Sequence, residues 1–255
     1  MTQITRAVNE PILSFAAGSS ERASLQAKYD EMATQTIEIP LIIDGKEIKT
    51  GDMGNCVMPH NHQHVLATYH KAGETEVIQA IDVAMKSWKT WSTTTLEERT
   101  KIFRKAAELL QGPWRDTINA ATMLNQSKNA FQAEVDAACE LIDFFNFNAQ
   151  YAEEITANQP LISPEGMHNH LEYRPLEGFV FAITPFNFTS IAGNLPSAPA
   201  LMGNVALWKP ASSAVLPCYY IMKMLEEAGL PAGVINFIPG SGGNVGNPVL
   251  SNSNL

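Results

Sequence analysis

The sequence predicts an α/β protein whose last third forms part of a parallel nucleotide-binding sheet. Apolar segments alternate with helical ones in this part of the chain. We expect strands at residues 179–183, 205–208 and 234–238, and helices at 192–202 and 215–228. A glycine loop at 240–246 then opens a further helix. This order of strands, helices and a glycine loop is typical of the first half of a Rossmann-like sheet.

Composition narrows the class of protein. Of the 255 residues, 45% are hydrophobic and 17% are charged, which is a globular balance. The net charge of −9 argues against a nucleic-acid partner, because phosphate binding needs a basic surface. No apolar run approaches the roughly 20 residues that span a bilayer. We expect a cytoplasmic protein without a membrane or nucleic-acid partner, or a mitochondrial matrix protein if the source is eukaryotic.

The first region, residues 1–70, is predicted to hold an N-terminal arm and a β-hairpin. A short helix should run from Glu21 to about Met32, with Ser20 as its cap. Residues 37–43 alternate and are β-branched, so they predict one strand. The turn Asp44-Gly45 then leads into a returning strand.

A histidine cluster lies in the stretch 53–69, which we interpret as rich in loops. His60, His62 and His64 invite a metal-site hypothesis. No cysteine or carboxylate within the run completes a ligand set. A solvated loop leading into a strand is the favoured interpretation, and we expect no metal.

Residues 71–160 are predicted to form the helical part of the cofactor domain. Apolar residues recur at helical spacing in four segments, at about 74–91, 96–111, 114–124 and 130–155. Thr95 and Glu98 have the spacing of a capping box at the start of the second helix.

The third region, residues 161–255, should hold an exposed strand at 168–174 and then the partial nucleotide-binding, Rossmann-like sheet. Only three parallel strands are expected there, so one sheet edge would leave its backbone groups unpaired. This expectation suggests a truncated chain.

Three features of the predicted sheet could carry chemistry. Asn187 follows the first strand, where its amide could stabilise an oxyanion or simply cap a turn. Lys209 ends the second strand, where it could meet ribose or phosphate groups or extend to solvent. The glycine loop departs from GxGxxG, because Val245 precedes Gly246. It could approach a phosphate or form a tight turn.

Other candidate groups have a plainer interpretation. Glu134 and Asp136 lie two residues apart on the long helix, so they point in different directions, and a solvated acidic face is the default. Cys56, Cys139 and Cys218 are widely spaced, so a disulfide framework is not expected. Cys139 and Cys218 also lack a neighbouring histidine or glycine loop that would activate a thiol, so we regard them as structural.

Three motifs resemble the aldehyde dehydrogenase superfamily. They are ITPFNF at 183–188, AGNLPSAPALMGN at 192–204 and LWKP at 207–210. More narrowly, QAEVDA at 132–137 and LIDFF at 141–145 resemble the Δ1-pyrroline-5-carboxylate dehydrogenase family, which oxidises L-glutamate 5-semialdehyde to L-glutamate in proline degradation. The resemblance covers essentially the whole chain.

The resemblance implies roles for individual residues. Asn187 is the implied catalytic residue, because it matches the side chain that stabilises the oxyanion. The implied NAD-binding residues are Thr184, Pro185, Phe186, Lys209, Gly242 and Gly246. Phe188 and Glu134 are implied to lie near the substrate.

The resemblance also implies what this sequence does not contain. The family's nucleophilic cysteine lies beyond the cofactor half, so this chain matches an N-terminal fragment. The implied reaction passes through a cysteine thioester, with hydride transfer to NAD. We expect the chain alone to be inactive, and the full-length enzyme to act on a small-molecule aldehyde as a homo-oligomer. Another aldehyde dehydrogenase, or a shortened non-catalytic nucleotide-binding chain, is the alternative.

Overall fold

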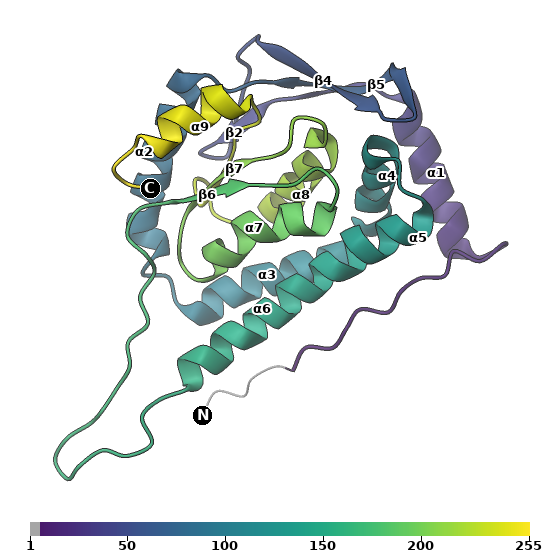
Figure 1. Cartoon of the computed structure of the whole chain (residues 1–255). Coiled ribbons are helices and arrows are strands. Elements are labelled where there is room, and N and C mark those ends of the chain that lie inside the picture. The colour runs from purple at the N-terminus through teal and green to yellow at the C-terminus, as the bar shows by residue number, and fades with distance from the viewer. Residues whose placement is uncertain (1–5) are drawn as a thin grey trace.

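A computed structural model describes residues 6–255 (Figure 1). Its helices are α1 (Ser20–Thr34), α2 (Glu74–Trp91), α3 (Leu96–Gln111), α4 (Arg115–Gln126), α5 (Ala130–Ala133), the π-helix η1 (Glu134–Cys139), α6 (Glu140–Ala157), α7 (Thr189–Leu201), α8 (Val215–Glu227) and α9 (Gly242–Leu250). Its strands are β1 (Ile37–Ile39), β2 (Leu41–Ile43), β3 (Lys46–Ile48), β4 (Met53–Met58), β5 (Asn61–His70), β6 (Val180–Ile183), β7 (Ala206–Lys209) and β8 (Ile235–Phe237).

The predicted parallel sheet is confirmed. Strands β6, β7 and β8 pair in parallel, with Val180 opposite Ala206 and Ala206 opposite Ile235. All four residues of β7 and all three of β8 are buried, as expected for central strands covered on both faces. Trp208 and Phe237 fill the core beneath them, with ring centroids 5.2 Å apart in an edge-on arrangement.

One side of the three parallel strands, beside β8, is covered by further strands, whereas β6 has no strand on its outer side among the described residues. The β2–β3 hairpin joins the sheet there, which gives the strand order β3-β2-β8-β7-β6. Its junction with β8 is antiparallel and rests on one residue pair, Ile42 with Phe237. At the opposite edge, the amide of Phe179 donates to the carbonyl oxygen of Asn254 over 2.9 Å. Strands from the expected first and third regions therefore share one sheet.

The segment 37–43 forms two strands in different sheets instead of the single strand that we expected. Proline lacks the amide proton of a sheet ladder, and Pro40 stands where the chain leaves one sheet for the other. Strand β1 pairs in parallel with β5, in a second sheet of order β1-β5-β4.

The stretch 53–69 is also more regular than expected. It forms the β4–β5 hairpin, in which His62 is exposed and His64 half-buried. Within residues 6–255, no group of three or more potential ligands is placed to hold a metal ion. Two members of the histidine cluster, His62 and His64, therefore lie on strand β5, whereas His60 lies in the turn before it.

The helices of the first two regions follow the prediction with two differences. Thr95 and Glu98 form the expected capping box of α3. Ser19, one residue earlier than expected, caps α1 and accepts from the amide of Arg22. The long helix expected at 130–155 is interrupted by the π-helix η1. In the described part of the chain, no helix has the length and apolarity needed to cross a membrane.

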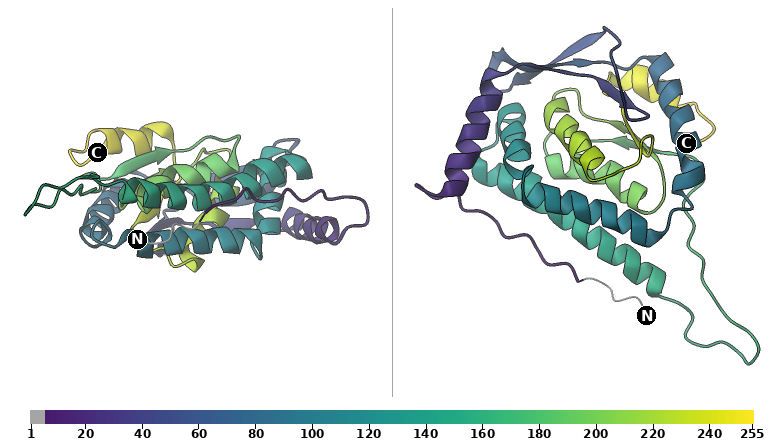
Figure 2. Two further views of the ribbon diagram at one scale, coloured as in Figure 1. Left: turned by 90° about the horizontal axis from the view of Figure 1, so that it is seen from below. Right: turned by 180° about the vertical axis from the view of Figure 1, so that it is seen from behind.

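Residues 158–178 form a protruding arm that contains no strand, although we expected one at 168–174 (Figure 1). Pro160, Pro164 and Pro175 remove backbone donors from this arm. The views in Figure 2 show the arm extending from an otherwise flat body. The N-terminal segment runs along α6, and the amide of Ala7 donates to Gln150 there (Figure 2).

Asn236 is expected to hold the hairpin on the sheet. Its buried amide accepts from the backbone of Asp44 and donates to the carbonyl oxygen of Gly233. Replacing Asn236→Ala leaves both groups unpaired, so we predict a loss of about 1–3 kcal/mol in the free energy of unfolding, measured by denaturant titration. The exposed control Asn55→Ala should change it by less than about 0.5 kcal/mol. Equal effects of the two substitutions would contradict this role.

Candidate functional site

Three loops meet at one edge of the sheet. Because β6, β7 and β8 are parallel, their carboxyl ends lie together. These ends carry the turn 184–188, the pair Lys209-Pro210 and the glycine loop. The first two loops are joined directly, since the amide of Thr184 donates to the carbonyl oxygen of Lys209 over 3.1 Å. The sequence prediction that these segments converge is confirmed.

The turn after β6 is exposed at its tip and anchored at its base. Phe186, Asn187 and Phe188 are exposed, whereas Thr189 and Ser190 are completely buried. Pro185 is half-buried beside them. The exposed amide of Asn187 is therefore free to meet a ligand, and two exposed aromatic rings flank it.

Side chains from the helical region hold the base of this turn. The hydroxyl of Thr189 contacts that of Thr122 at 2.8 Å and accepts from Gln126 at 2.8 Å. The hydroxyl of Ser190 donates to the carboxylate of Glu140. These contacts fix the first turn of α7 on α4 and α6.

Sequence analysis missed these anchors. Their partners in the turn lie 50 to 67 residues away along the chain, so no local spacing could connect them. A further missed residue is Lys128, whose ammonium group donates to the carbonyl oxygen of Asn187.

Thr184 is placed at the sheet edge, but its hydroxyl is directed into the protein. Its side chain is buried, and Oγ1 accepts from the indole Nε1 of Trp208 over 3.1 Å. A bound cofactor would thus meet the backbone at Thr184 more readily than its hydroxyl.

Lys209 is a buried cation without an acidic partner in the described residues. Its residue exposure is 7%, and its Nζ donates only to the neighbouring carbonyl oxygen of Pro210, over 3.3 Å. Burial lowers the pKa of this amine. An unpaired buried charge is costly, so polar atoms of a bound ligand would stabilise this ammonium group.

The glycine loop has an open face. An ideal Cβ placed on Gly242 or on Gly246 would meet no atom within 4 Å. Helix α9 begins at Gly242, and Ser241 caps it by accepting from the amide of Asn244 over 3.1 Å. Gly242 is exposed at the helix N-terminus, whereas Gly246 lies one turn further along α9 and is buried. An exposed glycine at a helix N-terminus suits the approach of a phosphate, so Gly242 and Lys209 fit a dinucleotide.

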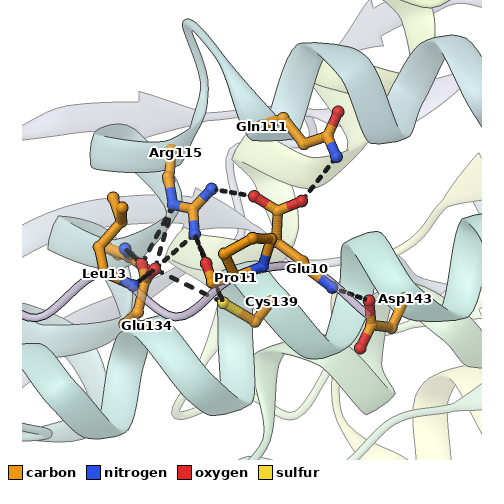
Figure 3. Close-up of polar contacts among 9 residues, drawn as sticks. Glu10, Pro11, Leu13, Gln111, Arg115, Glu134, Cys139 and Asp143 are labelled. Carbon is orange, nitrogen blue, oxygen red and sulfur yellow. Dashed lines mark hydrogen bonds and ion pairs between the residues drawn. The ribbon is translucent and has the colours of Figure 1, made fainter. Parts of the chain in front are cut away.

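Glu134 lies in a structural cluster instead of an open site (Figure 3). Its exposure is 0%, and its carboxylate accepts from Arg115, Asn119 and the amide of Leu13. Burial opposes its charge, but the hydrogen bonds from Arg115 and Leu13 outweigh burial and lower the pKa of this carboxyl. The contacts of Glu134 in this chain are therefore structural, and its place near the substrate stays a prediction.

The same cluster ties the N-terminal segment to the helices. Arg115 also pairs with Glu10 at 2.6 Å, and the amide of Glu10 donates to Asp143 at 2.7 Å (Figure 3). Cys139 completes the cluster, with its sulfur 3.5 Å from a carboxylate oxygen of Glu134. The cluster thus joins the N-terminal segment to α4, η1 and α6.

All three cysteines are buried and free. Burial raises the pKa of the thiols of Cys56 and Cys139 to about 12, and it raises that of Cys218 as well. A nucleophilic cysteine needs a lowered pKa and access to its substrate. In this structure, burial and a raised pKa leave none of the three thiols in that state.

Comparison with known proteins decides the family. The profile of the aldehyde dehydrogenase family matches residues 48–255. The chain belongs to the aldehyde dehydrogenase family. Its fold, with helices around a partly parallel sheet, is that of the corresponding half of these enzymes.

Relatives point to one branch of the family. A delta-1-pyrroline-5-carboxylate dehydrogenase of Agaricus bisporus is 51% identical over 233 residues, which are 91% of this chain and 43% of the relative. A mitochondrial enzyme of the same name from Dictyostelium discoideum is 48% identical over 248 residues, 97% of this chain and 44% of the relative. The chain therefore spans less than half the length of these relatives.

A solved structure agrees with the sequence comparison. The delta-pyrroline-5-carboxylate dehydrogenase of Mycobacterium tuberculosis, bound with NAD, superposes with a TM-score of 0.97 and 46% identity. The match covers 100% of this chain and 48% of that one.

Replacing Lys209→Met is predicted to stabilise the ligand-free protein. Removing an unpaired buried charge should raise the free energy of unfolding by about 1 kcal/mol or more at pH 7. The folded-state pKa is lowered, so the cost of the charge is fully present at low pH. That cost should disappear as the pH rises from the lowered pKa to the ordinary value of about 10.4. Denaturant titrations of both proteins between pH 7 and 10 measure the difference, and a destabilised variant would contradict the prediction.

Proposed function

We propose that this chain supplies the oxyanion donor and part of the NAD site of a dehydrogenase that converts L-glutamate 5-semialdehyde to L-glutamate in proline degradation. The observation that carries the proposal is the convergence of Asn187, the unpaired Lys209 and the open glycines at one sheet edge. The relatives described above, which share 46–51% identity with the chain, favour this substrate over other aldehydes.

Each residue of the edge has a role that its surroundings support. The ammonium group of Lys209 would donate to ribose hydroxyls, which ends its isolation as a buried cation. The loop with Gly242 and Gly246 would bring backbone amides to the phosphates. Pro185, Phe186 and the backbone of Thr184 would border the cofactor. Bound NAD would accept the hydride that the aldehyde loses on oxidation.

Asn187 and Phe188 would act on the aldehyde itself. The exposed amide of Asn187 can donate to an oxygen that becomes negative as a nucleophile adds to the carbonyl carbon. Phe188 offers an exposed ring beside that position. The nucleophile has to be a thiolate from outside this sequence, because the three cysteines here are buried with raised pKa values.

Assembly and location are parts of the same proposal. We propose that the complete enzyme is a homo-oligomer and works in the cytoplasm, or in the mitochondrial matrix if the source is eukaryotic. The Dictyostelium discoideum relative is named as mitochondrial, which supports the second location.

NAD binding tests the cofactor site directly. In calorimetric titrations, the 255-residue chain should bind NAD weakly, and Lys209→Met should weaken binding by about tenfold to a hundredfold, since hydrogen bonds to charged groups contribute about 1.5–3 kcal/mol. The exposed control Lys101→Met should bind like the parent. Equal binding of NAD by the parent and by Lys209→Met would contradict the proposed role of Lys209 in the cofactor site.

Catalysis by these 255 residues alone is expected to be absent. With L-glutamate 5-semialdehyde and NAD, no NADH absorbance at 340 nm should develop above the rate without protein. The complete gene product, assayed in parallel, should produce NADH if the proposal is right. Turnover by the 255 residues would show that one of the buried cysteines, or another group, serves as the nucleophile.

A further inference from the structure

The corner between α4 and α5 fixes the direction of one lysine. Ser127 ends α4 in the left-handed region, with φ 54° and ψ 39°, which is uncommon for a residue other than glycine. Its hydroxyl lies 2.7 Å from Nδ1 of His60 in the β4–β5 turn. Asn129 then caps α5 by accepting from the amide of Gln132 over 2.9 Å. Lys128 is thus held between two residues that are themselves anchored.

The side chain of Lys128 is mostly buried and does not extend into solvent. Only 15% of it is exposed, although lysine usually extends to the surface. Its ammonium group makes an ion pair with Asp136 and donates to the carbonyl oxygen of Asn187. It also lies 4.6 Å from the centroid of the Phe188 ring, within the range of a cation–π interaction.

Asp136 depends on this lysine. Its side chain is also only 15% exposed, and its Oδ1 is buried without a partner among residues 6–255. Burial and nearby Glu140 raise the pKa of its carboxyl, and Lys128 opposes both. A pair this buried differs from a surface salt bridge, whose contribution is often close to zero. Each charge would be left uncompensated without the other.

Two carboxylates of the π-helix η1, Glu134 and Asp136, form ion pairs with different cations. Within η1, Glu134 pairs with Arg115, while Asp136, two residues later, pairs with Lys128. π-Helical turns often occur at functional sites. Here one turn connects the N-terminal cluster of Figure 3 with the Asn187 turn.

We propose that Lys128, held by Asp136, is a positioning residue that sets the orientation of Asn187 for oxyanion stabilisation. The inference rests on the proposed function of Asn187. In the described chain, the side-chain amide of Asn187 makes no hydrogen bond. Its placement therefore depends on the backbone of the turn at residue 187. The anchors from Thr122, Gln126 and Glu140 hold residues 189 and 190. Lys128 is the side chain that holds the carbonyl of Asn187 itself.

The expected effect of losing Lys128 is local. The carbonyl of Asn187 and the amide of Phe188 belong to one peptide group, so releasing the first frees the second. Movement of this peptide would displace the side-chain amide of Asn187, which would then stabilise the oxyanion less, because a shift of about 1 Å in a catalytic group can reduce the rate about a hundredfold. NAD should still bind, because Lys209 and the glycine loop lie on other strands.

A nuclear magnetic resonance experiment on the 255-residue chain tests the contact without any assay of activity. In Lys128→Met, the backbone order parameter of the Phe188 amide should fall from about 0.85 to below about 0.6, while the amides of α4 and α6 keep their values. Lys128→Arg should restore most of the order, and the exposed control Lys105→Met should change nothing. An unchanged Phe188 amide in Lys128→Met would overturn the proposal. A loss of order throughout α4 and α6 would also overturn it, because Lys128 would then be needed for folding in general.

Kinetics of the complete gene product test the consequence. Lys128→Met should lower kcat for the aldehyde between about tenfold and a hundredfold and leave the Kd for NAD within a factor of about two, with partial recovery of kcat in Lys128→Arg. An unchanged kcat would overturn the positioning role. If the parent oxidises no aldehyde, the proposed function fails instead, whereas the order of the Phe188 amide still reports whether Lys128 holds the turn.

Discussion

The pairing of β7 with a parallel strand on each side is the constraint on which the rest of the structure depends. Parallel strands end at the same sheet edge, so this pairing brings the Asn187 turn, Lys209 and the glycine loop together. The pairing is supported from within by Trp208, which packs on Phe237 and donates to Thr184. One buried side chain thereby links all three central strands.

The helical region makes a second contribution, because it holds the turn that the sheet presents. Helices α4 and α6, together with Lys128 in the corner between α4 and α5, supply the side chains that contact residues 187–190. The π-helix η1 contributes Asp136, which pairs with Lys128. The cluster around Arg115 and Glu134 is completely or mostly buried and joins the same helices to the N-terminal segment. Well-packed supports of this kind keep a catalytic group in place, since an exposed loop cannot order itself.

Several features of the edge are unfavourable for folding. Lys209 is buried and has no acidic partner among residues 6–255, and Phe186 and Phe188 expose large aromatic surfaces. Folding alone favours none of these arrangements. By contrast, the buried charges of Arg115 and Glu134 satisfy each other and hold the chain together. The contrast between unsatisfied and satisfied charges separates the candidate site from the structural cluster.

The sequence by itself determined most of the helices, the three parallel strands and the residues at the sheet edge, but not the strands within 37–70 or the absence of a strand at 168–174. The spacing of Val77, Ile81 and Trp88 and the capping box of Thr95 concern neighbours along the chain, so they predicted α2 and α3 correctly. The tertiary structure alone decided which strands pair and which side chains contact each other. It placed β2 beside β8, buried Glu134 against Arg115, turned the Thr184 hydroxyl toward Trp208 and brought Lys128 to Asn187. Periodicity reports that a side chain is buried, but its partner depends on segments that meet only when the whole chain packs.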